Sequence, residues 1–423
     1  MQVAVIGAGI SGLCVAYQLR QLHDVTVFEG NDYVGGHTNT VEVGEANQTL
    51  AIDTGFIVFN DRTYPNFCRL LQELNVASQP SDMSFGIRCD RTGLEYAGTG
   101  LNGLFAQRLN MLRPGFWRLL RDWRRFGTEA AAILNQSSEA LTVREFFRDR
   151  NYSHEFREQY FLPIGSAIWS CPHELIDEFP IRFIVQFYHH HGLLTLADPP
   201  QWRVISGGSR TYVEAILARL QRPVVLNSPV QAVRRRPEGV VIHFRDGRQQ
   251  EFDHVVLACH ADQALRMLGE EATHVECELL AEFPYEKNIA TLHTDTSVLP
   301  RSRRAWASWN YHVPAEPTSK ATVTYHMNRL QSLSSKNDYC VTLNEEERID
   351  RSRILRSITY HHPVFTTSRL AAQRRHQELI DHAGLSYCGA YWGNGFHEDG
   401  VNSGLAVAKV LGGVRVRESV AAT

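Results

Sequence analysis

Three glycines near the N-terminus, Gly7, Gly9 and Gly12, have the spacing of a phosphate-binding turn. Glycine at these positions permits a tight turn, the close approach of a pyrophosphate, and close packing of a helix on a strand. Glu29 follows 17 residues after Gly12, where a carboxylate can accept hydrogen bonds from the hydroxyls of an adenosine ribose. An acid there favours a free 2′-hydroxyl and disfavours NADP, so these residues predict a dinucleotide site.

Two strands and a helix must position these residues. Residues 3–6 and 25–28 are apolar and predict strands, and residues 13–19 between them have helical character. Ile10 and Ser11 then lie at the start of the helix, where free N–H groups and the positive end of the dipole face the phosphates. This order of elements is the one that dinucleotide binding requires, although it does not separate NAD from FAD.

A second glycine pair, Gly35 and Gly36, comes soon after the acid and is followed by His37 and Thr38. A glycine pair just behind the second strand suits a chain that passes close to the pyrophosphate and ribityl of an extended FAD. Asp53 follows a further short strand at 49–52, and we expect its loop to return toward the cofactor.

A third segment, residues 388–404, lies near the other end of the sequence. It contains Glu398, Asp399, Gly400 and Val401, and it leads into an apolar helix that stops at Gly412. A helix that opens here presents N–H groups, which can lie beside the flavin C2 carbonyl and N1, where negative charge gathers on reduction. NAD enzymes do not need such a closing segment, so the three segments together predict FAD.

These segments resemble those of the flavin-containing amine oxidase superfamily, which includes monoamine oxidases, protoporphyrinogen oxidases and phytoene desaturases. Most of that superfamily has arginine where His37 stands. Four motifs are more closely similar to a bacterial branch of predicted NAD/FAD-binding oxidoreductases, namely residues 36–38, 293–295, 306–311 and 395–400. The resemblance spans almost the whole chain. It implies an α/β fold in which a discontinuous, GR2-type Rossmann-like FAD-binding domain carries an inserted α+β substrate domain.

We expect residues 1–80, 200–265 and 381–423 to form the FAD-binding domain, and residues 81–199 and 266–380 to form the substrate domain. Strands are predicted at 224–226, 240–244 and 253–260, with a hairpin turn at Asp246 and Gly247. In the substrate domain, residues 305–309 and 321–325 have the character of strands. The resemblance implies that the segment around Val230 contacts the adenine through backbone groups.

Phe396 and His397 are the first candidates for catalysis, because they precede the last helix at the place where the resemblance implies an aromatic wall beside the isoalloxazine. His397 could orient substrate or carry a proton near neutral pH, or it could only cap the helix or bond flavin. Lys287 stands where amine oxidases often have a flavin-linked lysine, and a solvated surface lysine is the alternative interpretation.

No metal site is predicted, because the adjacent histidines at 189–191 point in different directions and cannot readily share one ion. The eight cysteines are scattered without a C-x-x-C pair, so reduced thiols in a cytoplasm are expected. The resemblance places the covalently attached cysteine of amine oxidases farther upstream than Cys388, so we expect non-covalent FAD.

Residues 101–126 carry six arginines against one acid, Asp122, with aromatic and leucine side chains interleaved. Such a stretch could lie on a membrane surface, or it could be a helix pair that covers the substrate domain with solvated arginines.

The 423-residue chain has a net charge of −3, which disfavours a general nucleic-acid binder, and it shows neither a membrane-spanning run nor a signal peptide. We therefore expect a cytoplasmic protein that acts on a small, possibly lipid-like molecule.

Three functional interpretations stay open. The first is an FAD-dependent, amine oxidase-like oxidoreductase that transfers a hydride from a substrate C–H bond to flavin N5. The second is a flavin-dependent desaturase or isomerase of a fatty-acyl or polyene lipid. The third is a non-catalytic flavoprotein that supports a partner enzyme. The sequence does not distinguish their substrates, the electron acceptor or the oligomeric state.

Overall fold

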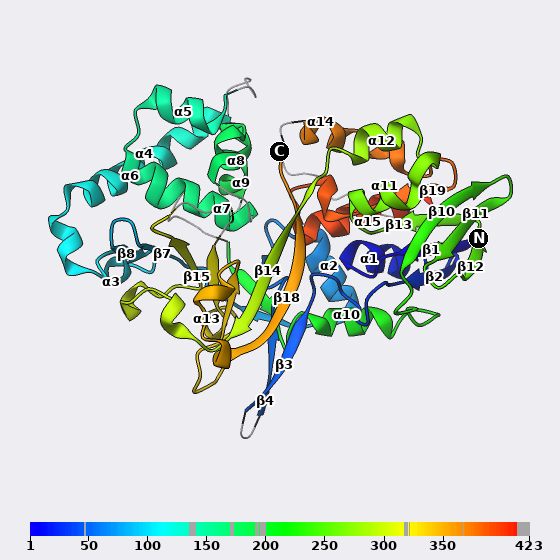
Figure 1. The fold of residues 1–423 in the computed structure, drawn as a ribbon, viewed down its shortest axis with the longest axis horizontal. Coiled ribbons are helices and arrows are strands. Elements are labelled where there is room, and N and C mark those ends of the chain that lie inside the picture. The colour runs from blue at the N-terminus through cyan, green and yellow to red at the C-terminus, as the bar shows by residue number, and fades with distance from the viewer. Residues whose placement is uncertain are drawn as a thin grey trace.

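The computed structural model describes residues 1–45, 48–134, 141–169, 173–190, 194, 200–316, 320, 322–366 and 368–412. It has the mixed α/β architecture that the sequence predicts, with helices and sheets in two groups that lie side by side (Figure 1).

A four-stranded parallel sheet forms the centre of the first group. β1 (Gln2–Ile6) lies between β2 (Asp24–Phe28) and β13 (His254–Leu257), and β19 (Leu385–Tyr387) pairs with the other side of β13. β13 and β19 are buried along their whole length, as in a parallel sheet covered on both faces. The sheet is therefore assembled from three distant parts of the sequence.

Helices from several parts of the chain surround this sheet. They are α1 (Ile10–Leu19), α2 (Pro65–Leu74), α10 (Arg210–Leu217), α11 (Ala261–Leu268), α12 (His274–Leu280), α14 (Arg369–Arg374) and α15 (His397–Val410).

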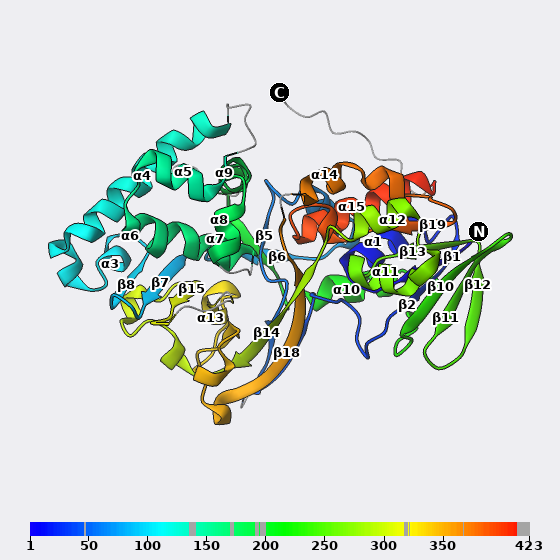
Figure 2. The ribbon, with the colours of Figure 1, turned by 45° about the horizontal axis from the view of Figure 1, so that its top comes forward.

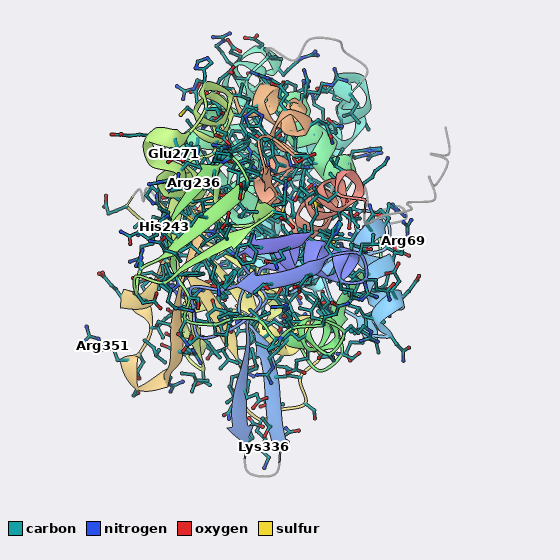
Figure 3. The ribbon with its side chains drawn as sticks, turned by 90° about the vertical axis from the view of Figure 1, so that its right-hand side faces the viewer. Arg69, Arg236, His243, Glu271, Lys336 and Arg351 are labelled. Carbon is teal, nitrogen blue, oxygen red and sulfur yellow. The ribbon has the colours of Figure 1, made fainter. Side chains whose placement is uncertain are left out.

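A smaller antiparallel sheet of β10 (Val230–Arg236), β11 (Gly239–Phe244) and β12 (Gln249–Phe252) lies at the edge, facing the viewer in Figure 3. The predicted hairpin turn at Asp246 and Gly247 joins β11 to β12 and is confirmed. The strand predicted at 224–226 is wrong: only Val225 forms a single bridge, to Phe28. Prolines at 223 and 229 flank this segment, and proline donates no hydrogen bond to a sheet.

The second group is built on a seven-stranded sheet in the order β18-β14-β17-β16-β15-β7-β8. Its strands are β7 (Phe85–Cys89), β8 (Leu94–Ala97), β14 (Tyr285–His293), β15 (Trp309–Val313), β16 (Val323–His326), β17 (Cys340–Leu343) and β18 (Ile354–Pro363), with α13 (Met327–Leu330) beside them.

The strand predicted at 305–309 begins only at Trp309. The Asn310 side chain accepts a hydrogen bond from the Ala307 N–H (2.9 Å) and donates to the Ala307 carbonyl (2.6 Å), which closes a turn in front of the strand. The strand predicted at 321–325 corresponds to β16.

Helices cover one end of this sheet around an aromatic core. They are α3 (Leu101–Leu104), α4 (Pro114–Leu134), α5 (Val143–Arg150), α6 (His154–Phe156), α7 (Leu162–Trp169), α8 (His173–Glu178) and α9 (Ile181–His190), with a 3₁₀ turn at Arg108–Leu112 and a π turn at Arg157–Phe161. Figure 2 shows them apart from α1, α11, α12, α14 and α15, with β14 and β18 between the two groups.

Short strands connect the groups. β3 (Thr40–Glu45) pairs with β4 (Gln48–Asp53), and β9 (Trp202–Ile205) pairs with β5 (Phe59–Asn60) and β6 (Ser78–Pro80). Asp53, which ends β4, accepts hydrogen bonds from Ser209 and Thr40, so its carboxylate holds α10 against β3. Within the described part of the chain, no helix is long and apolar enough to cross a bilayer.

Candidate functional site

The glycine turn joins β1 to α1 as its spacing predicts. A Cβ on Gly7, whose φ is +107°, would lie 2.6 Å from the Ala258 carbonyl oxygen, and a Cβ on Gly12 would lie 2.0 Å from the Gly7 oxygen. Both positions therefore need glycine for packing. Gly9 differs, since it has φ −77° at the N-cap of α1 and a Cβ there would meet nothing within 4 Å. The structure leaves open space beside Gly9, at a helix N-terminus that no side chain caps.

Glu29 follows β2 directly and lies beside this turn. Its Oε2 accepts from the Ala8 N–H (2.9 Å), and its Oε1 accepts from the backbone and side-chain N–H groups of Asn31 (both 3.0 Å). The Ser228 N–H donates to the Glu29 carbonyl (2.9 Å), and Val230 begins β10 two residues later. The acid and the Val230 segment are thus neighbours in space.

The second glycine pair lies on the first turn. The Gly35 N–H donates to the Ala8 carbonyl (2.9 Å). A Cβ on Gly36, whose φ is +61°, would lie 3.4 Å from the Gly9 Cα. This contact brings His37 close to the open space beside Gly9.

Helix α15 closes the site from the other end of the chain. A Cβ on Gly400 would lie 2.8 Å from Ile10 Cγ2, and a Cβ on Gly404 would lie 2.8 Å from the Ser11 carbonyl oxygen. Val401 between them is buried. The glycine face of α15 therefore packs directly on the first turn of α1, and the two ends of the chain form one site.

The two carboxylates at the start of α15 make hydrogen bonds within the protein. Glu398 accepts from the N–H groups of Asn66 (3.0 Å) and Phe67 (2.9 Å) at the start of α2. Asp399 accepts from the Phe396 N–H (2.9 Å), which caps its own helix. Burial raises the pKa of Asp399 to about 6 and also raises that of Glu398. Their side chains therefore stabilise the ends of α2 and α15.

His397 is buried where the two ends meet. Its ring stacks on Phe56 (centroids 3.5 Å apart), and its Nε2 lies 2.8 Å from the Tyr212 hydroxyl and 3.2 Å from the Thr38 hydroxyl. Burial lowers the pKa of His397 to about 3, so the imidazole is neutral at pH 7. This environment favours an orienting role and argues against proton transfer by His397 near neutral pH.

Strand β18 adds a group that the sequence analysis missed. His37 stacks on Tyr360 (4.7 Å between centroids) and lies 5.2 Å from His362, whose Nδ1 is 2.9 Å from the Asn288 amide nitrogen. The Nε2 of His37 is buried and has no hydrogen-bond partner within the described residues. Burial, followed by the neighbouring histidines, holds the pKa of His37 well below its usual value. Only the pairing of β18 with β14 brings these rings to the glycine turns, so no local motif could have revealed them.

An aromatic cluster borders the same region. Phe396 stacks on Phe187 of α9 (5.1 Å between centroids), and a Cβ on Gly395 would lie 3.9 Å from the Phe365 ring. The cluster continues into the core of the helical group through further aromatic rings, namely Trp169, Phe179 and Phe183. The start of α15 is therefore apolar on one side and lined with histidines on another.

Lys287 is not brought into this group. It pairs with His361 in the β14–β18 register, whereas Asn288 pairs with Tyr360. Successive side chains of a strand point to opposite faces, so Lys287 lies on the face away from Tyr360 and His37. Its side chain is exposed, which agrees with the alternative interpretation of Lys287 as a solvated surface lysine.

Among the described residues, no three histidine, cysteine, aspartate or glutamate side chains gather as metal ligands would. Of the three adjacent histidines, His189 is exposed and His191 lies outside the described residues. The Cys388 thiol is buried, and burial raises its pKa well above the usual value.

A parallel sheet whose first strand leads through a glycine turn into an uncapped helix, with an acid after the next strand, defines a dinucleotide-binding fold. The chain belongs to the flavin containing amine oxidoreductase family, whose model matches residues 10–298.

The similar proteins agree with this assignment. An L-amino-acid oxidase of Siganus canaliculatus is 20% identical over 72% of this chain and 57% of its own length. A putative flavin-containing monoamine oxidase of Mycobacterium tuberculosis is 27% identical over 61% of this chain. The matched region covers 56% of that relative, so the chain spans just over half the length of these relatives.

Solved structures share the fold at low identity. A putative protoporphyrinogen oxidase from Exiguobacterium has a TM-score of 0.67 at 15% identity, covering 97% of this chain and 98% of its own. A variant of putrescine oxidase has a TM-score of 0.68 at 15% identity, covering 97% and 99%. A fatty acid isomerase from P. acnes that produces CLA has a TM-score of 0.64 at 16% identity, covering 97% of each chain.

Proposed function

We propose that this protein is an FAD-dependent oxidoreductase of the amine oxidase-like type, which removes a hydride from a substrate C–H bond. The observation that carries the proposal is the packing of α15 on the first turn of α1, through Gly400 and Gly404. That contact brings the first turns of α1 and α15 together, as the binding of an extended dinucleotide with a redox-active ring requires.

The residues around the open space beside Gly9 fit FAD. The uncapped N–H groups at Ile10 and Ser11 would hold the pyrophosphate, and the open position at Gly9 would admit it. Glu29 would accept from the ribose hydroxyls, with the backbone near Val230 beside the adenine. The unpartnered Nε2 of His37 supports a polar ligand on the other side of the glycine pair.

FAD, when bound, accepts a hydride at its N5 atom. The protein then has to hold the substrate C–H bond over the ring and exclude water. Phe396 and Phe187 would form an apolar wall for the substrate, and neutral His397 would keep Tyr212 and Thr38 in place behind it. Lys287 has no part in this proposal, because its strand face is the opposite one.

We further propose that FAD is held without a covalent bond. Attachment through sulfur needs a thiolate, and burial raises the pKa of Cys388 well above its usual value. Denaturing the purified protein with acid tests this directly. All flavin should appear in the supernatant, and yellow colour in the pellet would contradict the proposal.

The proposal leaves the chemical class of the substrate to be determined. An aromatic wall beside neutral histidines suits an uncharged, apolar group, which is compatible with a deprotonated amine and with an acyl or polyene chain. An anaerobic screen separates the possibilities. Bleaching of the flavin by amines alone supports amine oxidation, and bleaching by acyl lipids alone supports a desaturase. Flavin that no candidate reduces supports a redox-neutral isomerase or a non-catalytic flavoprotein, and contradicts the oxidoreductase.

A further inference from the structure

Helix α3 and the start of α4 lie at the end of the helical group, away from the parallel sheet (Figures 1 and 2). Nine large apolar side chains are exposed among the described residues, and five of them lie within 17 residues of each other. We name these five the tip patch: Leu101 (75% exposed), Leu109 (69%), Met111 (48%), Leu112 (79%) and Trp117 (51%). The other four are spread over the rest of the molecule.

The tip patch is separate from the hydrophobic core of the helical group. Helix α4 already buries an inner face of Phe116, Leu119 and Phe126. Trp117 points to the outer face, where its Nε1 donates to the Met111 carbonyl (2.8 Å) and fixes the ring beside the 3₁₀ turn. Exposed apolar patches of this kind mark interaction sites, because leaving them in water is unfavourable.

The charges in the segment that carries the tip patch are mostly positive. Exposed arginines stand at 108, 113, 118, 121 and 124, and the segment's one acid, Asp122, is buried and accepts from the Ser153 N–H (2.8 Å). Arg118 pairs with Glu155 and Arg121 pairs with Asp122. Arg113 and Arg124 have no carboxylate partner among the described residues. This surface is therefore cationic on a chain whose net charge is −3.

We propose that the tip patch docks the protein on an anionic lipid bilayer. Leu101, Leu109 and Leu112 are each more than two-thirds exposed and stand out from the surface, as side chains that insert into a bilayer do. Leu112 also borders an open hollow with Met111, Trp117 and Arg118. Tryptophan lies at the level of the lipid headgroups, and arginines are attracted to anionic lipid, so Trp117 and the exposed arginines complement the leucines.

Co-sedimentation of the full-length protein with vesicles tests the proposal. The protein should pellet with phosphatidylglycerol vesicles and much less with phosphatidylcholine vesicles. Both L109S/L112S and R113E/R124E should weaken binding at least about tenfold, since each removes one of the two contributions. Flavin content and melting temperature of each variant confirm that it is folded.

Matched controls lie elsewhere on the molecule. Leu355 on β18 is also exposed (46%), and Arg351, labelled in Figure 3, is an exposed arginine in the 3₁₀ turn that precedes β18. Leu355→Ser and Arg351→Glu should bind vesicles like the unchanged protein. Absence of binding to anionic vesicles, or equal losses in the controls, would overturn the proposal. A change in oligomeric state on R113E/R124E without vesicle binding would assign the patch to a second copy of the chain instead.

Discussion

The turn around Gly9 and the aromatic region around Phe396 lie next to each other but are built in different ways. The turn is made of backbone, where Gly7, Gly12 and Gly400 approach neighbouring atoms so closely that no side chain fits. The aromatic region is made of side chains that arrive from α9 and β18 and meet at the start of α15. A backbone site tolerates almost no change, whereas a side-chain site can be altered to suit another substrate.

The largest expected effects are in the backbone site. Gly12→Val should prevent folding, because a Cβ there would lie 2.0 Å from the Gly7 oxygen.

Gly9→Val should fold, because its Cβ meets nothing, yet it should lose at least about 90% of its flavin by filling the pyrophosphate space. The ratio of flavin absorbance to protein measures this. Gly44→Val, where a Cβ also meets nothing, is the control and should keep its flavin. Full flavin occupancy in Gly9→Val would refute the placement.

Acid should destabilise the protein next most strongly. Burial lowers the pKa values of eight histidines: His37 to well below its usual value, His260, His293, His362 and His376 to about 4, His397 to about 3, and His254 and His326 below their usual value. Below pH 6.5 these histidines bind protons in the unfolded chain but not in the folded chain. The free energy of unfolding therefore decreases as the pH is lowered from about 6.5 to 4. Asp53 and Asp399, whose pKa values are raised to about 6, oppose this change in part. Each proton that the chain takes up on unfolding corresponds to about 1.4 kcal/mol per pH unit, and the histidines outnumber the two aspartates, so the net effect is a loss of stability in acid.

Denaturant titrations at several pH values measure that slope. His293 is fully buried, so His293→Gln should reduce the slope by nearly one proton. Gln250 on β12 is exposed and does not titrate, so Gln250→Asn should leave the slope unchanged. A stability that is flat between pH 6.5 and 4.5 would contradict the burial of the histidines.

His397 should affect the reaction more than the cofactor. His397→Ala should slow anaerobic flavin reduction about tenfold while flavin content stays within a factor of two, because its contacts are to Tyr212 and Thr38. Tyr212→Phe should reproduce part of the loss, since it removes the hydroxyl and keeps the packing. Because the His397 imidazole is already neutral, it should add no step to the pH dependence of the reduction rate between pH 6 and 8. The unchanged protein and His397→Ala should therefore have pH profiles of the same shape in that range. Unchanged reduction kinetics would make His397 purely structural.

The smallest effect is expected in the aromatic region. Phe187→Ala should leave the flavin bound and change which substrates reduce it, since the cavity next to Phe396 favours a larger apolar group. Stability should fall by about 3 kcal/mol. The measurement is the ratio of the flavin reduction rates with a small and with a large substrate. A loss of flavin in this variant would show that the two regions are not separable.

The difference between the regions also explains what the sequence could predict. Gly7, Gly9, Gly12 and Glu29 form a local motif, so the sequence predicts the first strands, the turn and the class of cofactor. The aromatic and histidine contacts of Phe187, Tyr360 and His362 depend on how distant strands and helices pair, and no spacing encodes that. Lys287 is a candidate by position alone, and position does not tell which face of a strand a side chain takes.

The most direct test is a crystal structure of the protein purified with its flavin. The adenine end should lie between Glu29 and the Val230 backbone, and the isoalloxazine should lie at the first turn of α15, within contact of Phe396. A flavin bound away from α15, or an adenine remote from Glu29, would contradict the central claim that both ends of this chain enclose one cofactor.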